Sequence, residues 1–239
     1  MVEKNYTIPI NEQFDKVLAG EDCGCPMCSL HKRLEQQNLD YIMGAAMMEP
    51  DVRIRSNETG FCRKHFNDML AMKNRLSLAL MLQSYLGELD RKLTPPKTIK
   101  FGGGRQAKND LEKQVSEVKR ASDACFVCER MAGTLQGYYS NVVHLWRKEP
   151  EFRAKFDAQP FFCFEHTAGL FRMAQAELPP KMLPDFCTVL FTVARKRMDV
   201  VKDEIDRFCK SFDYQFAGQP LGEAALGVEH AIDWVLGEV

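Results

Sequence analysis

CPMC at residues 25–28 and GFCRKH at residues 60–65 set the pattern of this chain, because both arrangements recur as CFVC at residues 125–128 and FFCFEH at residues 161–166. The two CxxC pairs lie one hundred positions apart, and the two Cys-x2-His pairs lie one hundred and one apart. An aromatic residue precedes the cysteine of each Cys-x2-His pair. Self-similarity at a fixed spacing indicates copies of one structural unit. The sequence therefore predicts two similar units, roughly residues 8–93 and 109–212.

These residue types at this spacing are typical of a structural metal site. Zinc takes four ligands in a tetrahedron and readily accepts thiolate sulfur and imidazole nitrogen. Residues three apart share a helix face, so each motif directs two donor atoms toward one point. The partial positive charge of a helix N-terminus stabilises the thiolates. We predict two bound zinc ions, with an iron–sulfur cluster as the alternative, and the ligands Cys25, Cys28, Cys62, His65, Cys125, Cys128, Cys163 and His166.

The sequence leaves two ways to combine the four motifs. The even spacing inside each unit favours local closure, in which each CxxC pair meets the next Cys-x2-His pair along the chain. In a swapped arrangement, the CxxC pair of one unit would meet the Cys-x2-His pair of the other. His31 lies three residues after Cys28 and could compete as a ligand, but the repeat places Met131 at the matching position. We expect His31 and the unpaired His144 to be surface or core residues, and we expect packing or incidental roles for Cys23, Cys187 and Cys209.

Apolar residues recur at steps of three and four through both units, which predicts helices. Leu78, Leu82, Leu86, Leu89 and Leu93 form one such stripe, and alternating strand patterns are nearly absent. We predict an all-α protein: a first metal-binding unit at residues 1–93, a basic Pro/Gly linker at 94–108, a second unit at 109–212, and a C-terminal tail at 213–239 with a helix from Glu223 to about Leu236. Prolines at 179, 180 and 184 should break the last helix of the second unit.

Composition excludes several classes of protein. The net charge is −1, which gives no overall attraction to nucleic acid or to membranes. The N-terminal stretch lacks the apolar core of a signal peptide, and no apolar run is long enough to cross a bilayer. Nine cysteines in an expected cytoplasmic protein indicate metal or redox chemistry more than disulfides. The glycine and histidine motifs of nucleotide-binding proteins and common hydrolases are missing.

Several segments resemble a family of uncharacterised bacterial proteins, a domain of unknown function common in Gram-positive anaerobes. The resembling segments run along nearly the whole length: TIPINEQF, CGCPMC, GFCRKH, RLSLALML, CFVCER, FFCFEH and KSFDYQFAGQPLGEA. The resemblance implies a full-length member that carries both motif pairs at the eight residues named above. It implies no activity.

Three functions are compatible with these observations. The first is a non-enzymatic zinc-binding adaptor, in which metal fixes the structure and the helical surface binds a protein partner or a second copy. The second is a thiol-based redox or metal sensor that releases its metal on oxidation. The third is nucleic-acid binding through the basic linker, which carries six positive charges over residues 91–108.

Overall fold

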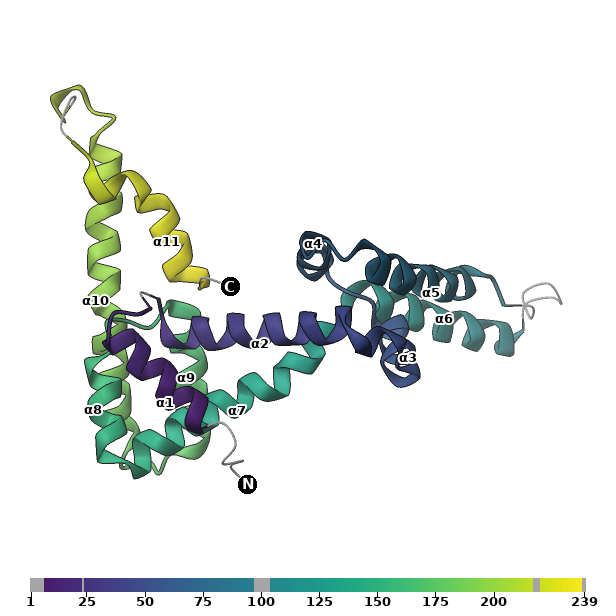
Figure 1. Ribbon diagram of the computed structural model, residues 1–239, viewed down its shortest axis with the longest axis horizontal. Coiled ribbons are helices and arrows are strands. Elements are labelled where there is room, and N and C mark those ends of the chain that lie inside the picture. Colours follow the sequence, from purple (N-terminus) through teal and green to yellow (C-terminus); the bar gives the residue numbers. More distant parts are fainter. Residues whose placement is uncertain (1–6, 23, 97–103, 217–219, 238–239) are drawn as a thin grey trace. The chain divides into compact units, whose positions relative to one another are not determined.

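The computed structural model describes residues 7–22, 24–96, 104–216 and 220–237, and the regular elements within these ranges are all helices, with no strand (Figure 1). The α-helices are α1 (Thr7–Leu18), α2 (Pro26–Met43), α3 (Pro50–Thr59), α4 (Arg63–Ala71), α5 (Arg75–Leu93), α6 (Arg105–Asp123), α7 (Phe126–Lys148), α8 (Pro150–Ala158), α9 (Phe164–Glu177), α10 (Leu183–Lys210) and α11 (Gly227–Leu236). The all-α prediction is confirmed. No helix of the described residues has the length and apolar character needed to cross a membrane.

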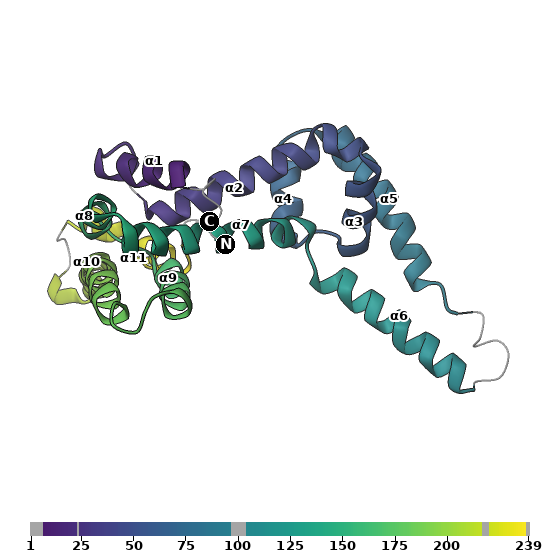
Figure 2. The same cartoon turned by 90° about the horizontal axis from the view of Figure 1, so that it is seen from below.

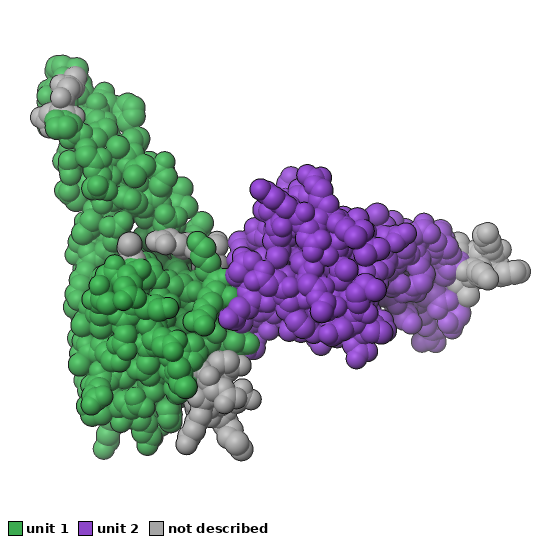
Figure 3. Space-filling model, in the orientation of Figure 1, with its two compact units in different colours: residues 1–33, 134–239 green, residues 34–133 purple. Residues whose placement is uncertain are grey.

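Two compact units divide the chain, and they are not the sequential halves that the repeat predicts (Figure 3). Unit 1 combines residues 1–33 with 134–239, and unit 2 consists of residues 34–133. Both boundaries therefore fall inside long helices, α2 and α7, instead of at the expected linker. Of that linker, residues 97–103 lie outside the described residues, and residues 105–108 already belong to α6.

Unit 1 is built around a core of aromatic side chains. The ring of Phe14 on α1 lies 5.0 Å from Phe152 on α8 and 6.1 Å from Phe162, which precedes α9. Phe156 lies 4.8 Å from Phe162 and 5.4 Å from Phe186 on α10, and all five rings are fully buried. Tilted aromatic contacts at these distances contribute beyond the area they bury. The core thus fixes the short loop that leads into Cys163.

Unit 2 packs α3, α5 and α6 against one another (Figure 2). The hydroxyl of Tyr85 on α5 donates a hydrogen bond to the carbonyl of Ala121 at the end of α6, at 3.1 Å. The amide of Gln114 on α6 donates to the carbonyls of Lys92 and Thr94 at the end of α5. These bonds hold the start of α7, and with it Cys125, against the rest of the unit.

Local sequence explains most helix ends. Pro50 and Pro150 stand in the first turns of α3 and α8, where a missing N–H is tolerated. The predicted proline break is confirmed, since α9 ends at Glu177 and α10 begins at Leu183. A break also separates α4 from α5, at Lys73, whose φ of 61° lies in the left-handed region. The C-terminal helix begins at Gly227, after a 3-10 turn over Gly222–Leu226.

Candidate metal centres

The first group of donor atoms, here called the Cys25 cluster, consists of Cys25, Cys28, Cys163 and His166, all within unit 1. Cys25 immediately precedes α2 and Cys28 lies in its first turn, while Cys163 caps α9 and His166 lies in the first turn of α9. His166 Nδ1 lies 3.0 Å from the Cys163 sulfur, 3.3 Å from that of Cys28 and 4.0 Å from that of Cys25. None of the four residues is more than 3% exposed.

The second group, the Cys62 cluster, consists of Cys62, His65, Cys125 and Cys128, all within unit 2. His65 Nδ1 lies 3.2 Å from the sulfurs of Cys62 and Cys125, and 3.5 Å from that of Cys128. His65 and Cys125 are buried, but Cys62 is only partly buried and Cys128 is exposed. The two clusters therefore share a donor set and differ in their access to solvent.

The local closure favoured by the spacing is wrong, and the swapped alternative describes the structure. Each CxxC pair meets the Cys-x2-His pair of the other predicted unit, so the sulfurs of Cys28 and Cys163, 135 positions apart, lie 3.6 Å from each other. Helix packing brings these elements together. In unit 2, the backbone N–H of Phe126 donates to the carbonyl of Gly60 at 2.9 Å, which places Cys125 directly against the loop that carries Cys62.

Backbone geometry at the four motifs directs the donors inward. The N–H of Cys28 and the N–H of Ser29 both donate to the carbonyl of Cys25, which forms the first turn of α2. Cys62 and Cys163 cap α4 and α9 with almost the same extended backbone, at φ −70°, ψ 165° and φ −66°, ψ 163°. All eight donors thus lie at helix N-termini, whose partial positive charge favours thiolates.

The donor atoms fit a tetrahedral zinc ion. With Zn–S bonds of about 2.3 Å and Zn–N bonds of about 2.0–2.1 Å, a regular tetrahedron separates sulfur from nitrogen by about 3.6 Å and sulfur from sulfur by about 3.8 Å. The sulfur–nitrogen distances here run from 3.0 to 4.0 Å, and all donors of a cluster lie within 4.8 Å of one another. The cysteines of both clusters are free thiols, with no disulfide among them.

Each cluster favours one ionised sulfur when no metal is bound. Hydrogen bonds from Cys25 and Cys28 lower the Cys163 pKa to about 4, whereas burial raises the Cys25 pKa well above its ordinary value. In the Cys62 cluster, burial opposes ionisation of Cys125, but hydrogen bonds from His65 and from the backbone of Cys128 and Cys62 together outweigh it and lower the Cys125 pKa to about 6. Burial and the neighbouring Cys125 raise the Cys128 pKa to about 12. Metal binding must therefore release protons from the remaining thiols.

A carboxylate contacts His65 of the Cys62 cluster at Nε2, the ring nitrogen that does not face the sulfurs. Glu35 on α2 accepts from His65 Nε2 at 2.8 Å and also pairs with the ammonium of Lys64, which lies 3.3 Å from Asp68. The hydrogen bond from His65, with help from Lys64, lowers the Glu35 pKa to about 2. Glu35 was not predicted from the sequence. The available signal was its place two helical turns after Cys28, on the same face of the expected helix as that cysteine.

The remaining thiols and histidines stay outside both clusters. The ring of His31 packs edge-on against His166, with centroids 5.9 Å apart, and so borders the Cys25 cluster without joining it. His144 is partly buried on α7. Cys187 and Cys209 lie on α10, partly buried and exposed respectively. Cys23 lies outside the described residues.

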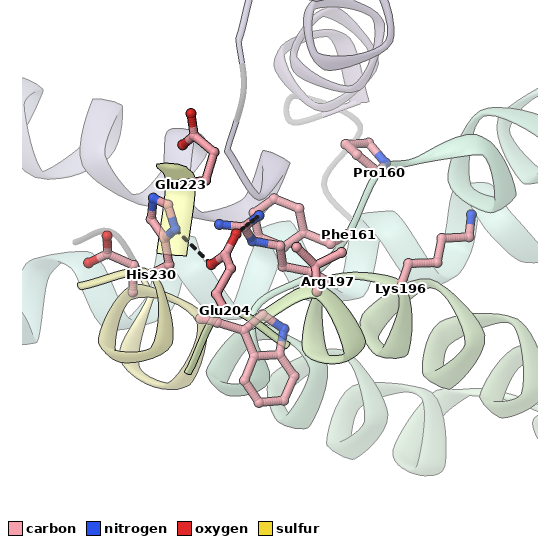
Figure 4. A pocket seen from close by; sticks show the side chains of 10 residues that line it. Pro160, Phe161, Lys196, Arg197, Glu204, Glu223 and His230 are labelled. Atoms are coloured by element: carbon pink, nitrogen blue, oxygen red, sulfur yellow. Dashed lines mark hydrogen bonds and ion pairs between the residues drawn. The ribbon is translucent and has the colours of Figure 1, made fainter. Parts of the chain in front are cut away.

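A pocket of about 810 Å³ in unit 1 is a separate feature (Figure 4). The buried carboxylate of Glu204 on α10 lies at its centre, 2.8 Å from His230 Nδ1 on α11 and 3.9 Å from an Arg197 nitrogen. Phe161 and Glu223 also line the pocket. The contact between His230 and Glu204 attaches α11 to α10.

The whole chain, residues 1–239, matches the model of a family of unknown function, DUF6062. The chain belongs to this family. No curated protein and no solved structure matches it. The predicted membership of a family of unknown function is thus confirmed, the bacterial origin stays a prediction, and the family supplies no activity.

Proposed function

We propose that this family member is a non-enzymatic helical scaffold that binds two structural zinc ions, one in each cluster. The observation that carries the proposal is that each cluster presents four donors of the Cys3His type within 4.8 Å. Structural zinc sites use all four positions for protein ligands, whereas catalytic sites keep one open for water or substrate. Neither cluster leaves such a position, so hydrolysis at the metal is not expected.

X-ray absorption on the purified protein tests this proposal. Two zinc ions per chain, each with three sulfurs and one nitrogen, are the expected result. An iron–sulfur cluster would be visible as colour and as iron in elemental analysis. One metal per chain, or an oxygen ligand at either metal, would remove the basis for the closed-site argument.

An adaptor would bind its partner through its surface, because protein ligands fill all four positions of each proposed metal site. Val228, Ile232, Val235 and Leu236 on α11 recur at helical spacing and are exposed. Ile232 is 53% exposed and Leu236 is 62% exposed. Contiguous exposed apolar residues mark interaction sites more often than singly scattered ones do. Light scattering over a range of concentrations, on the wild type and on Ile232→Glu, would show whether this face holds a second copy.

A redox sensor is the second candidate, and the exposure of Cys128 favours it. In this reaction hydrogen peroxide oxidises two thiolates of the Cys62 cluster to a disulfide, two protons are consumed, two waters form, and the zinc ion leaves. A zinc-binding dye should then report rapid release of one equivalent, which a thiol reductant and added zinc reverse. The buried Cys25 cluster should keep its metal. Slow, equal release from both clusters would leave the scaffold as the function.

The nucleic-acid alternative depends on the basic segment at residues 94–108. Residues 97–103 of that segment lie outside the described residues, and no described contact of the rest favours the alternative.

A further inference from the structure

The histidines of the two clusters have different surroundings, although their donor sets are the same. His65 Nε2 faces the Glu35 carboxylate at 2.8 Å. For His166, the position that matches Glu35 in the repeat is Leu135, which has no polar side chain, and the neighbouring rings are His31 and Tyr139. One cluster therefore has a carboxylate behind its histidine, and the other has aromatic rings.

The position of Glu35 determines which nitrogen of His65 is free to bind metal. A neutral imidazole carries one N–H and one lone pair, and an ionised carboxylate can only accept. In the neutral ring that binds metal, Nε2 keeps its proton because Glu35 accepts from it, so the lone pair lies on Nδ1, the nitrogen that faces the three sulfurs at 3.2–3.5 Å. The hydrogen bond also fixes the orientation of the ring.

Charge around Glu35 is balanced by a neighbour on the same helix as His65. A zinc ion with three thiolates carries about one negative charge, and Glu35 adds another close by. The ammonium of Lys64 contacts Glu35 and lies 3.3 Å from Asp68. It therefore offsets this charge and already fills the space between the two acids, so a second metal ion is not needed there. At the position that matches Lys64, the repeat has Glu165.

We propose that Glu35 is a positioning residue of the Cys62 metal centre, which it supports by holding His65 with Nδ1 toward the metal; among the described residues, His166 of the Cys25 centre has no carboxylate at the matching position. This inference rests on the proposed zinc scaffold. Carboxylate partners of metal-bound histidines commonly fix the ring and raise its basicity, and their loss lowers metal affinity by roughly 10–100-fold.

The test compares Glu35→Leu, which installs the residue found at position 135, with Glu35→Gln, which keeps an acceptor oxygen but removes the charge. Asp40→Asn, an exposed acid on the same helix, is the control for charge alone. Zinc affinity is measured by competition with a chromophoric chelator, and the emptied cluster is identified by alkylation and mass mapping of Cys62, Cys125 and Cys128. In parallel, NMR follows the hydrogen-bonded Nε2–H of His65.

Glu35→Leu should lower the zinc affinity of the Cys62 cluster by roughly 10–100-fold, leave that of the other cluster unchanged, and abolish the protected Nε2–H signal. Glu35→Gln should show a smaller loss and keep the signal, so it decides the question if the leucine variant fails to fold. Asp40→Asn should match the wild type. If the wild type binds two zinc ions and neither Glu35 variant affects the Cys62 cluster selectively, the Glu35 inference is overturned. If the wild type binds no zinc, the proposed scaffold itself fails.

Discussion

Replacing two cysteines with serine should remove one metal or both, depending on which pair is replaced. Cys28 and Cys163 belong to the same cluster, so the double variant Cys28→Ser/Cys163→Ser should lose one zinc ion and keep the other. Cys28 and Cys62 belong to different clusters, so Cys28→Ser/Cys62→Ser should lose both. Under the local closure favoured by the spacing, these two outcomes would be exchanged. The two doubles contain the same number of substitutions, and each is the control for the other.

The expected loss of affinity is large enough to measure. Structural zinc contributes about 10–16 kcal/mol of apparent binding energy in small zinc-finger peptides. Divided over four ligands, that is roughly 2.5–4 kcal/mol for each, or about two to three orders of magnitude in dissociation constant. A second substitution in a cluster that has already lost one ligand has little zinc-binding energy left to remove. The effects of substituting two cysteines of one cluster should therefore be strongly non-additive, and the effects of substituting cysteines of different clusters should be close to additive.

The assay is elemental analysis after dialysis against a chelator strong enough to strip a three-ligand site but not a four-ligand site. The single variants Cys28→Ser, Cys62→Ser and Cys163→Ser should each retain one zinc ion, and circular dichroism checks that each is helical. One zinc ion in Cys28→Ser/Cys62→Ser together with none in Cys28→Ser/Cys163→Ser would refute the swapped pairing.

Three further outcomes are expected. Gly60→Ala should lower the free energy of unfolding by about 1–3 kcal/mol, because φ 66° with ψ −156° is accessible essentially only to glycine. Gly87→Ala, at a position on α5 where an added methyl group meets open space, should raise the free energy of unfolding by about 0.5–1 kcal/mol. Urea denaturation of both variants measures these opposite effects. In metal-free protein, the ionised Glu35 carboxylate stabilises the fold at pH values above 4.5, the ordinary pKa of the group, and this contribution should be lost as the pH falls toward the lowered pKa of about 2. Glu35→Gln should therefore flatten the dependence of urea stability on pH between these two values, and an unchanged dependence would contradict the assignment. His230→Ala removes a partner of the buried Glu204 carboxylate, so limited proteolysis should cut α11 sooner than in the wild type, whereas equal cleavage rates would show that the contact does not hold α11.

The helical class and the donor residues could be predicted because both depend on local sequence. Stripes such as Leu78 to Leu93 have the period of a helix whatever they pack against. The cysteine and histidine motifs place two donors on one helix turn without any help from the rest of the chain. The break at Lys73 was missed, because nothing in the pattern there resembles the prolines that interrupt the later helix.

The pairing of the motifs could not be predicted, because spacing is a weak energetic signal. Closing the chain between Cys28 and Cys163 costs about 4.3 kcal/mol in loop entropy, against about 3.1 kcal/mol for the local closure between Cys28 and Cys62. The difference of about 1 kcal/mol is smaller than the packing of a single buried phenylalanine. The aromatic core around Phe14 and Phe162, which joins residues far apart in the chain, is therefore enough to reverse it.

The two clusters are nested along the chain, and this imposes an order on their assembly during synthesis. The last ligand of the Cys62 cluster is Cys128, and the last ligand of the Cys25 cluster is His166, 38 residues later. At roughly 5–20 residues per second, a ribosome delivers that interval in about 2–8 s. For this period Cys25 and Cys28 have no native partner, and Cys62 and His65 are the nearest donors. Capture of Cys62 and His65 by Cys125 and Cys128 removes that competitor before Cys163 and His166 are made, so formation of the inner cluster leaves Cys25 and Cys28 available for the outer one.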